Sequence, residues 1–484
     1  MGKRKRNNGV ARASTTHEEA PTKRAKASNL SNGTAPVTIQ IVTGSYDRVL
    51  HGMTVTISPH DEVEFADTFL FNAHSSAIRC LAISPPSVPE PGKAQKVMLA
   101  SGSSDERINV YHISAHPPKR KDKDVLSSIA PRKILENPKN RELGTLLHHS
   151  STITALSFPT KSKLISASED STIAVTRTRD WSLLSTIKVP IPMAQGRPSG
   201  DTAALGGTPA GVNDFAVHPS MKLMISVSKG ERSMRLWNLM TGKKAGVLNF
   251  SRDMLQEVGE GKHSSGEGRS VVWGATEEGD EFCVGFDRDL IVFGMDSTPK
   301  CRVMPEPKRK IHKFCYVPMD STTDSSLLAV STEDGRIMFF STRTEDLALV
   351  EPNTEKKPKK LPIARLVAEV GGKEAGVTGR IKDFAMCRVT GKQGDELLIP
   401  TGSSDGKVRL FRLGTQELAE VRKTKTSKQV GKLLGTYETQ NRITCVSAFV
   451  MIPRPEGVED SDDEFDDVSD EEDEDNDDEE EDEK

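Results

Sequence analysis

The sequence predicts an all-β protein, a seven-bladed β-propeller closed by pairing strands from the two ends of the chain. Three observations lead to this prediction. One pattern of two short strands joined by a tight turn occurs seven times, a further strand flanks most copies, and the two chain ends supply complementary parts of one unit. The 484 residues are enough for one large repeat fold.

Each copy contains an apolar pair, a turn rich in Ser and Gly, and a run of alternating apolar residues. Alternation with period two is typical of a strand with one buried face. The copies occupy residues 41–55, 99–113, 164–178, 224–239, 283–295, 329–341 and 400–413. In six of them an aspartate closes the turn, at Asp47, Asp105, Asp170, Asp287, Asp334 and Asp405.

Additional strands complete each unit. A strand with its own alternation precedes most copies, at 77–84, 152–159, 212–219, 269–276, 311–318 and 381–388, and a fourth strand follows most. Four antiparallel strands in each of seven units describe a propeller of the WD-repeat type. The first copy has no strand before it, whereas 442–450 is a strand with nothing after it. Pairing these two ends completes the seventh blade and removes an exposed sheet edge.

Charge divides the chain into three parts: a basic N-terminal segment (1–36), the propeller (37–452) and an acidic tail (453–484). Residues 459–484 contain 20 Asp and Glu and one Lys, a net charge of −19, so the rest of the chain carries +15. A block of like charges repels itself and stays solvated, so we expect both terminal segments to be disordered. The basic remainder predicts polyanionic partners.

Polar residues of the repeat resemble the His–Asp–Ser–aromatic network of WD repeats. The expected members are His74, Asp105, Tyr111, His149, Asp170, Trp237, Asp334 and Asp405. The alternative interpretation is a hydrolase with a Ser/His/Asp triad. Because the set recurs around the ring, which a single active site would not do, we favour a structural network that satisfies buried turn groups.

Two other segments resemble a phosphate-binding loop and a metal site, but the spacing of their residues does not fit either kind of site. The glycine-rich segment 259–270 departs from the phosphate-loop spacing, and His148 and His149 have no further metal ligands nearby in sequence. The six cysteines are scattered, which favours a reducing compartment. The sequence contains no stretch of 18 apolar residues, which is the length that a membrane-spanning helix requires. The sequence therefore predicts a non-enzymatic protein without cofactor, metal, membrane or small-molecule substrate.

Three long insertions are expected to connect the third and fourth strands of their blades: 114–142, 343–361 and 414–432. Together they carry a net charge of +8 and should emerge at one face of the ring. We therefore predict contacts to RNA phosphates from Lys119, Arg120, Lys121, Lys356, Lys357, Lys359, Lys360, Arg422, Lys423 and Lys425. The alternative is a solvated lysine surface without function.

Two basic clusters near the N-terminus are candidates for a nuclear import signal: Lys3, Arg4, Lys5, Arg6, Lys23, Arg24 and Lys26. The alternative interpretations are an RNA-binding arm and a solvated basic tail. In the acidic tail, Ser461 and Ser469 precede acidic residues and match sites of acidophilic kinases. Phosphorylation there would deepen a negative charge that is already present.

Several segments together resemble one WD-repeat family, the large-ribosomal-subunit assembly factors related to the yeast "maintenance of killer" protein and the animal PAK-interacting protein. The resemblance rests on TGSYDRVLHGMTV (43–55), GTLLHHSSTITALSF (144–158), HPSMKLMISVSKGERSMRLWNLMTGK (218–243) and NRITCVSAFV (441–450). It implies a nucleolar, non-enzymatic scaffold in precursors of the large (60S) subunit, with rRNA, ribosomal proteins and other assembly factors as partners. The alternative that it implies is a signalling adaptor that restrains a PAK-type kinase.

Overall fold

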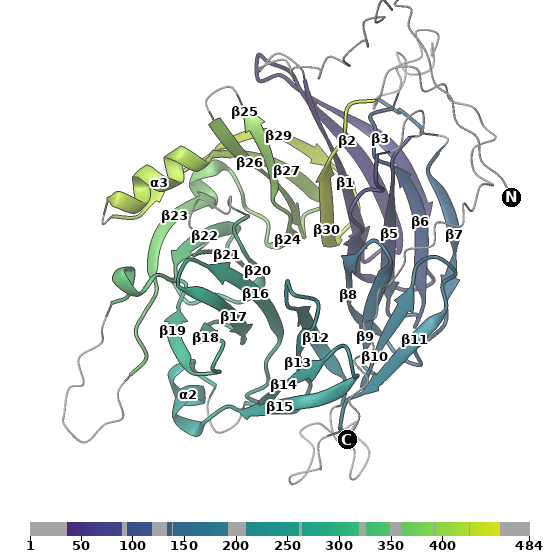
Figure 1. Cartoon of the computed structure of the whole chain (residues 1–484). Coiled ribbons are helices and arrows are strands. Elements are labelled where there is room, and N and C mark those ends of the chain that lie inside the picture. Colours follow the sequence, from purple (N-terminus) through teal and green to yellow (C-terminus); the bar gives the residue numbers. More distant parts are fainter. Residues whose placement is uncertain are drawn as a thin grey trace, which may run out of the picture.

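The computed structural model of the chain describes residues 36–89, 94–118, 133–137, 139–191, 210–260, 264–318, 326–348, 360–391, 394–424 and 426–454. Its strands form seven sheets that stand around a common centre like the blades of a propeller (Figure 1). The predicted all-β, seven-bladed architecture is confirmed. We number the blades from 1 to 7 in the order in which their innermost strands occur along the chain.

Blades 1 to 4 each contain four antiparallel strands, which follow one another from the innermost strand outward. Blade 1 consists of β4 (Ile78–Ile83), β5 (Lys96–Ser103), β6 (Ile108–Ser114) and β7 (Arg141–Leu146). Blade 2 consists of β8 (Ile153–Thr160), β9 (Lys163–Ser168), β10 (Thr172–Arg177) and β11 (Leu183–Lys188). Blade 3 consists of β12 (Val212–Val217), β13 (Leu223–Ser228), β14 (Ser233–Asn238) and β15 (Lys243–Asn249). Blade 4 consists of β16 (Ser270–Thr276), β17 (Gly279–Gly285), β18 (Leu290–Gly294) and β19 (Pro299–Val303).

Blades 5 to 7 depart from this plan in one way each. Blade 5 consists of β20 (Ile311–Tyr316), β21 (Leu327–Thr332), β22 (Arg336–Ser341) and β23 (Arg365–Gly371), to which the short β28 (Lys428–Gln429) adds. Blade 6 has its inner strand in two pieces and consists of β24 (Ile381–Phe384), β25 (Cys387–Gly391), β26 (Gly394–Ser403), β27 (Lys407–Gly414) and β29 (Lys432–Glu438). Blade 7 combines the chain ends and consists of β30 (Ile443–Val450), β1 (Val37–Ser45), β2 (Val49–Ile57) and β3 (Val63–Asn72). The helices of the described residues are α2 (Arg252–Glu257), α3 (Thr415–Lys423) and the 3-10 turns η1 (Thr344–Asp346) and η2 (Lys373–Ala375).

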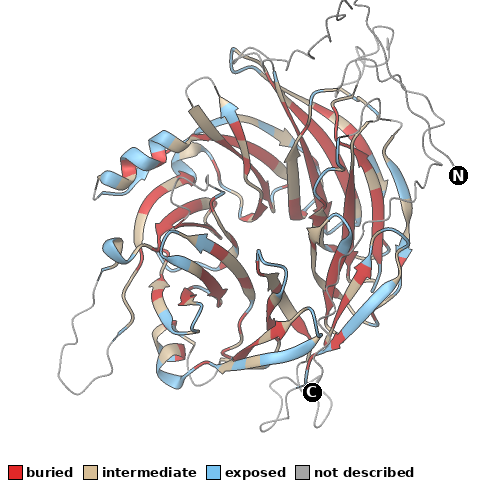
Figure 2. Cartoon of the chain, in the orientation of Figure 1, coloured by how far each residue is buried: buried red, intermediate tan, exposed pale blue. Residues whose placement is uncertain are grey.

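Burial falls from the middle of each blade to its outer edge (Figure 2). The second strand of blade 1, β5, is buried along almost its whole length, whereas the outermost strand of blade 2, β11, is exposed at five of its six residues. Neighbouring blades cover both faces of the middle strands, so these strands can be apolar on both sides. The outer strands face solvent and carry more polar residues.

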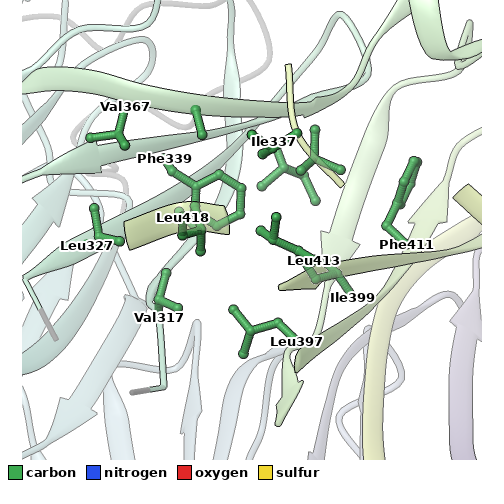
Figure 3. Packing of buried hydrophobic residues seen from close by; sticks show 14 of the residues in the cluster. Val317, Leu327, Ile337, Phe339, Val367, Leu397, Ile399, Phe411, Leu413 and Leu418 are labelled. Carbon is green, nitrogen blue, oxygen red and sulfur yellow. The ribbon is translucent and has the colours of Figure 1, made fainter. Parts of the chain in front are cut away.

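Each blade packs face to face against the next through an apolar cluster. Between blades 5 and 6, this cluster includes Phe339 of β22, which lies beside Leu418, and Ile399 of β26, which lies beside Leu413 (Figure 3). Helix α3 contributes Leu418 and Val421 to the same cluster, so this insertion is part of the core rather than a loop on its surface. The charge pattern of this segment indicates a loop and does not predict the helix.

Blade 7 closes the ring as the sequence predicts. Strand β30 pairs antiparallel with β1, with Ile39 opposite Val450 and Thr43 opposite Val446. The Thr444 hydroxyl also donates a 2.7 Å hydrogen bond to the carbonyl of Ile78 in blade 1. The C-terminal strand thus joins the N-terminal strands to the neighbouring blade, and β1 is not left as an unpaired edge.

Two glycines let the closing blade approach its neighbours. A Cβ atom on Gly402 of blade 6 would lie 2.7 Å from Cγ2 of Ile443 in blade 7. A Cβ atom on Gly44 of blade 7 would lie 2.7 Å from Cγ2 of Ile78 in blade 1. Since real carbon atoms do not approach this closely, glycine is required at both positions for the observed contact between blades.

The connections of the blades emerge at two rims of the ring. Because successive strands run in opposite directions, the strand 1–2 and 3–4 connections lie at one rim, which we call the insertion rim. The strand 2–3 and 4–1 connections lie at the other, which we call the turn rim. The three long insertions follow β6, β22 and β27, the third strands of blades 1, 5 and 6. All three therefore leave the ring at the insertion rim, as predicted.

The expected His–Asp–Ser network is present in blades 1 and 2. In blade 1, His74 Nδ1 lies 3.1 Å from an Asp105 carboxylate oxygen and Nε2 lies 2.8 Å from the Ser101 hydroxyl. Asp105 also accepts the Ser75 backbone N–H at 2.9 Å. The Tyr111 ring is buried and stacks against another aromatic ring of the propeller. These bonds satisfy polar groups that the turn would otherwise bury without partners.

Blade 2 repeats the arrangement. His149 Nε2 lies 2.8 Å from the Ser166 hydroxyl, and Nδ1 lies 3.2 Å from Asp170. Burial alone would raise the pKa of Asp170, but hydrogen bonds from His149, Thr172 and Ser150 outweigh it and hold the pKa below its usual range. The carboxylate is therefore charged in the folded state and contributes to stability.

Other blades use variants of the network. Trp237 of blade 3 donates its indole N–H to the Ser226 hydroxyl at 2.8 Å. In blades 5 and 6 an arginine takes the place of the histidine: Arg336 Nε lies 2.9 Å from Asp334, and Arg409 lies 2.8 Å from Asp405. The turn aspartate is thus retained while its partner changes, which a catalytic set would not tolerate.

The closure of the ring generates a first prediction. Ile443→Ala should lower the free energy of unfolding by about 3 kcal/mol, because a buried side chain at the contact between blades 6 and 7 is removed and leaves a cavity. Leu433→Ala, on the exposed outer strand of blade 6, is the control and should change it by less than about 0.5 kcal/mol. Urea denaturation followed by circular dichroism measures both, and equal effects would contradict a special role of closure.

The network of blade 2 generates a second prediction. His149→Ala should lower the free energy of unfolding by about 2 kcal/mol, because the Ser166 hydroxyl and Asp170 lose a partner. His60→Ala, at an exposed position, is the control and should leave the free energy of unfolding unchanged.

The same network predicts a dependence of stability on pH. Since the folded-state pKa of Asp170 is lowered from 3.8, the stabilising effect of its carboxylate is full above that value and is lost as pH falls below it. The acid dependence of the thermal midpoint should therefore be weaker in His149→Ala, and an unchanged dependence would count against this assignment.

Candidate functional site

The three insertions do more than leave the ring at one rim, because each folds back onto the outer strand of the preceding blade. Residue Ile134 bridges Asp67 of β3, Ile363 bridges Arg302 of β19, and Lys428 pairs with Ala368 of β23. All three pairings are parallel. The insertions of blades 1, 5 and 6 thus cover the outer edges of blades 7, 4 and 5, and they latch neighbouring blades together.

Backbone hydrogen bonds hold two of these latches in place. The Asp67 N–H donates to the Lys133 carbonyl at 2.9 Å, and the Leu135 N–H donates to the Asp67 carbonyl at 2.8 Å. At the second latch, the Arg302 N–H donates to the carbonyl of Pro362 at 2.8 Å. The described ends of the insertions therefore lie along the outer wall of the ring.

Most of the predicted phosphate contacts lie outside the described residues. These are Lys119, Arg120, Lys121, Lys356, Lys357, Lys359 and Lys425. Lys360 is exposed at the outer wall, beside Leu361, whose N–H donates to Glu257 of α2 at 3.1 Å. Lys423 is exposed at the end of α3. Lys360 thus lies next to a residue bonded to α2, whereas Lys423 follows Arg422, whose carbonyl is bonded to Arg365 of blade 5.

Arg422 has a structural role in the described part of the chain. Its guanidinium donates to the hydroxyls of Ser326 at 3.0 Å and Ser341 at 3.2 Å, and it lies 3.5 Å from Asp346. Its backbone carbonyl accepts a hydrogen bond from Arg365 at 2.8 Å. The side chain is 15% exposed and fixes α3 to blade 5, so it is not directed to a phosphate.

A cavity of about 670 Å³ lies between blade 7, blade 6 and α3 at the insertion rim. Its floor contains Val37, Ile57 and Leu398. Glu417 and Glu420 of α3 contribute acidic side chains to its rim. In the described residues the insertion rim is therefore mixed in charge, and the positive excess predicted for it falls largely on residues outside them.

The central channel contains a small group of interacting charges. Lys313 of blade 5 lies 3.9 Å from Asp383 of blade 6, and the attraction of this carboxylate raises the pKa of the lysine. Asp383 accepts the N–H of Val446 in blade 7 at 2.9 Å. Asp214 of blade 3 likewise accepts the N–H of Val271 in blade 4, and burial raises the pKa of the Asp214 carboxyl to about 6. These aspartates tie the inner strands of adjacent blades together.

Two kinds of chemical site, a metal centre and a reactive thiol, do not form in the described portion. Its residues contain no group of three or more His, Cys, Asp or Glu that could hold a metal ion. Burial raises the pKa of all six cysteine thiols, to about 12 for Cys301, Cys315, Cys387 and Cys445, so they are not thiolates at neutral pH. No helix in the described ranges is long and apolar enough to cross a membrane.

The terminal candidates lie outside the described residues. These are the import candidates Lys3, Arg4, Lys5, Arg6, Lys23, Arg24 and Lys26 and the phosphorylation candidates Ser461 and Ser469. Strand β1 begins at Val37 and β30 ends at Val450.

Comparisons with known proteins agree with the fold. Residues 140–175 match the family model of the WD domain, G-beta repeat. Protein MAK11 of Saccharomyces cerevisiae is 28% identical over 409 residues, which cover 79% of this chain and 80% of that protein. The p21-activated protein kinase-interacting protein 1-like protein of Xenopus laevis is 24% identical over 421 residues, covering 87% and 84%. Its counterpart in Danio rerio is 23% identical over 414 residues, covering 85% and 81%.

The propeller, the repeated structural network and these similarities agree with one another. Together they point to a non-catalytic scaffold. The chain is a seven-bladed β-propeller that carries a match to the WD-repeat model and is similar along most of its length to Protein MAK11 and to the p21-activated protein kinase-interacting protein 1-like proteins.

Proposed function

We propose that this protein is a non-enzymatic assembly factor of the large (60S) ribosomal subunit, acting in the nucleolus as a docking platform for pre-ribosomal RNA and proteins. The observation that carries the proposal is the similarity to Protein MAK11 along most of both chains. The residues of the first repeat copy, of segment 144–158 and of the closing strand support the same family on sequence alone.

The distribution of charge supports a ribonucleoprotein setting. Outside the acidic tail the chain is strongly basic, and basic clusters suited to nuclear import stand near its N-terminus. A closed ring with latched insertions holds its surface positions rigidly, which suits a platform that binds several partners at once. The acidic tail is a complementary surface for basic ribosomal proteins.

A second candidate function is regulation of a PAK-type protein kinase. Its support is the name of the vertebrate relatives, which are 22–24% identical to this chain. Such an adaptor would act partly in the cytoplasm and would not need a basic surface.

Fractionation of a cell extract on a sucrose gradient tests the two functions against each other. We expect the tagged full chain to sediment with precursors of the large subunit, and its depletion to lower the ratio of large to small subunits. A tagged full chain that carries the Ile443→Ala change, which weakens the ring, should be recovered in smaller amounts from these fractions. Sedimentation at the top of the gradient together with a kinase would instead support the second function.

The insertion lysines give a more specific prediction. Replacement of Lys119, Arg120, Lys121, Lys356, Lys357, Lys359, Lys360, Lys423 and Lys425 by glutamine should weaken RNA binding and flatten its dependence on salt. The slope of log K against log salt should fall by about 0.7 for each single-strand phosphate that is no longer neutralised. Fluorescence anisotropy with labelled RNA measures this slope. An unchanged slope would show that the insertions do not contact RNA phosphates.

A further inference from the structure

Four consecutive blades carry a basic residue at the same structural position of the turn rim. The position lies immediately before the first paired residue of the innermost strand. Blades 4 to 7 have Arg269, Lys310, Arg380 and Arg442 there, and we call these four residues the basic arc. Blades 1 to 3 have the uncharged Ala77, Thr152 and Gly211 at the same position.

The backbone at this position is fixed by the fold, whereas the side chain is not. In blades 5 to 7 the first turn residue donates its N–H to the carbonyl of the arc residue, for example from Glu333 to Lys310 at 3.0 Å and from Tyr46 to Arg442 at 2.8 Å. In blade 4 the Arg269 N–H donates instead to the carbonyl of Gly285 at 2.8 Å. The corresponding carbonyls of Ala77, Thr152 and Gly211 accept the same bond at 3.1, 2.9 and 2.8 Å. Since three blades form this bond without a charge, folding does not require the cations of the other blades.

The arc continues into the mouth of the channel through the second residues of two inner strands. His312 Nε2 of blade 5 lies 3.5 Å from Lys382 Nζ of blade 6. Burial, followed by repulsion from Arg380, Arg442 and Lys310, lowers the pKa of Lys382. Burial and neighbouring cations, Lys382 first among them, lower the pKa of His312 to about 4. Positive charge is thus concentrated here at an energetic cost, which a bound anion would relieve.

Acidic residues offset this charge only in part. Arg380 lies 3.2 Å from Glu333, whereas Arg269 and Lys310 share Asp287 at 3.3 and 3.7 Å. Among the described residues, the side chains of Lys382 and Arg442 have no carboxylate within the 4.0 Å of an ion pair, although Asp47 accepts the backbone N–H of Arg442 at 3.0 Å and Glu333 attracts Lys382 from a longer distance. Both remain able to bind an anion from outside.

An exposed aromatic ring stands at the end of the arc. Tyr46 is 59% exposed, and the Arg442 guanidinium lies 5.6 Å from the centre of its ring. Nucleic-acid-binding proteins that recognise single strands combine a track of cations with aromatic rings on which bases stack. The three insertions at the opposite rim contain almost no aromatic residues.

We infer that the turn rim binds single-stranded RNA, with its phosphates along the basic arc and Lys382 and a base stacked on Tyr46. This inference rests on the proposed function and adds to the predicted contacts of the insertions a second RNA contact on the opposite rim. Cations repeated from blade to blade match a polymer with one charge in each unit. A phosphorylated peptide would instead present a single dianion and would need the cations to converge on one point.

Anisotropy of a labelled oligouridine with the full chain, titrated at several salt concentrations, tests the inference. The variant Arg380→Gln/Lys382→Gln/Arg442→Gln should bind more weakly, and its salt slope should fall by about 2, since each single-strand phosphate contact contributes about 0.7. The matched control Lys222→Gln/Lys243→Gln/Lys244→Gln removes the same charge from exposed positions of blade 3. It should leave the slope unchanged.

The aromatic contact is tested separately in the same assay. Tyr46→Ala should weaken binding about tenfold through the loss of base stacking, whereas Tyr46→Phe should retain it. Thermal midpoints of all variants establish that each is folded. Because the arc bond recurs in blades without a cation, we expect the midpoints to match that of the unmodified protein.

Three results would overturn the inference. The arc variant could keep the affinity and salt slope of the original chain, or the control variant could lose as much as the arc variant. The arc variant could also lose binding to a phosphorylated or glutamate-rich peptide while it keeps binding to oligouridine, which would identify a protein partner. Sedimentation of the unmodified chain remains an independent test, so failure of the arc and failure of the proposed function are distinguishable.

Discussion

The pairing of β30 with β1 is the constraint on which the rest of the structure depends. A propeller of separate sheets has two free blade faces until its last blade is complete, and here the completing strand comes from the far end of the chain. Gly44 and Gly402 make the closing blade fit by removing side chains where its isoleucine contacts lie. Once the ring is closed, the position of every connection at either rim is fixed by the blades beneath it.

A second level of organisation stabilises this ring from its outer wall. Three insertions return to the outer strand of the preceding blade and pair with it in parallel. Helix α3 adds buried leucine and valine side chains between blades 5 and 6, and Arg422 fixes its end. Segments whose charge suggests solvent-exposed loops therefore include structural latches. Their functional residues must be sought in the parts that the latches leave free.

The fold could be predicted from the sequence to a large extent because the repeat contains its own evidence. Alternating apolar residues define the strands, the turn aspartates define their order, and an inner strand at 442–450 without a following copy predicts the closure. These patterns depend on local chemistry. The parallel latches could not be predicted, since they involve two or three residues each and lack a periodic pattern.

The candidate site was predicted less completely for a related reason. Net charge identified the insertions, but charge alone does not distinguish Arg422, which binds serine hydroxyls of blade 5, from a residue directed to solvent. The basic arc could not be predicted from the sequence, because its members are about 40 to 70 residues apart and each is a single cation before a strand. Only alignment of the blades by their strand pairing shows that they occupy equivalent positions.

The carbonyl bond that recurs before the inner strands has an evolutionary consequence. It fixes the main chain in every blade but the fourth, and it forms with alanine and threonine in blades 1 and 2 as well as with lysine and arginine in blades 5 to 7. Gly211 of blade 3 is the exception, because a Cβ atom there would lie 2.7 Å from Cα of Glu169. At the other positions that form this bond, point mutations can change the charge of the turn rim one blade at a time while the bond is kept. Related propellers can diverge in their choice of ligand while their architecture stays the same.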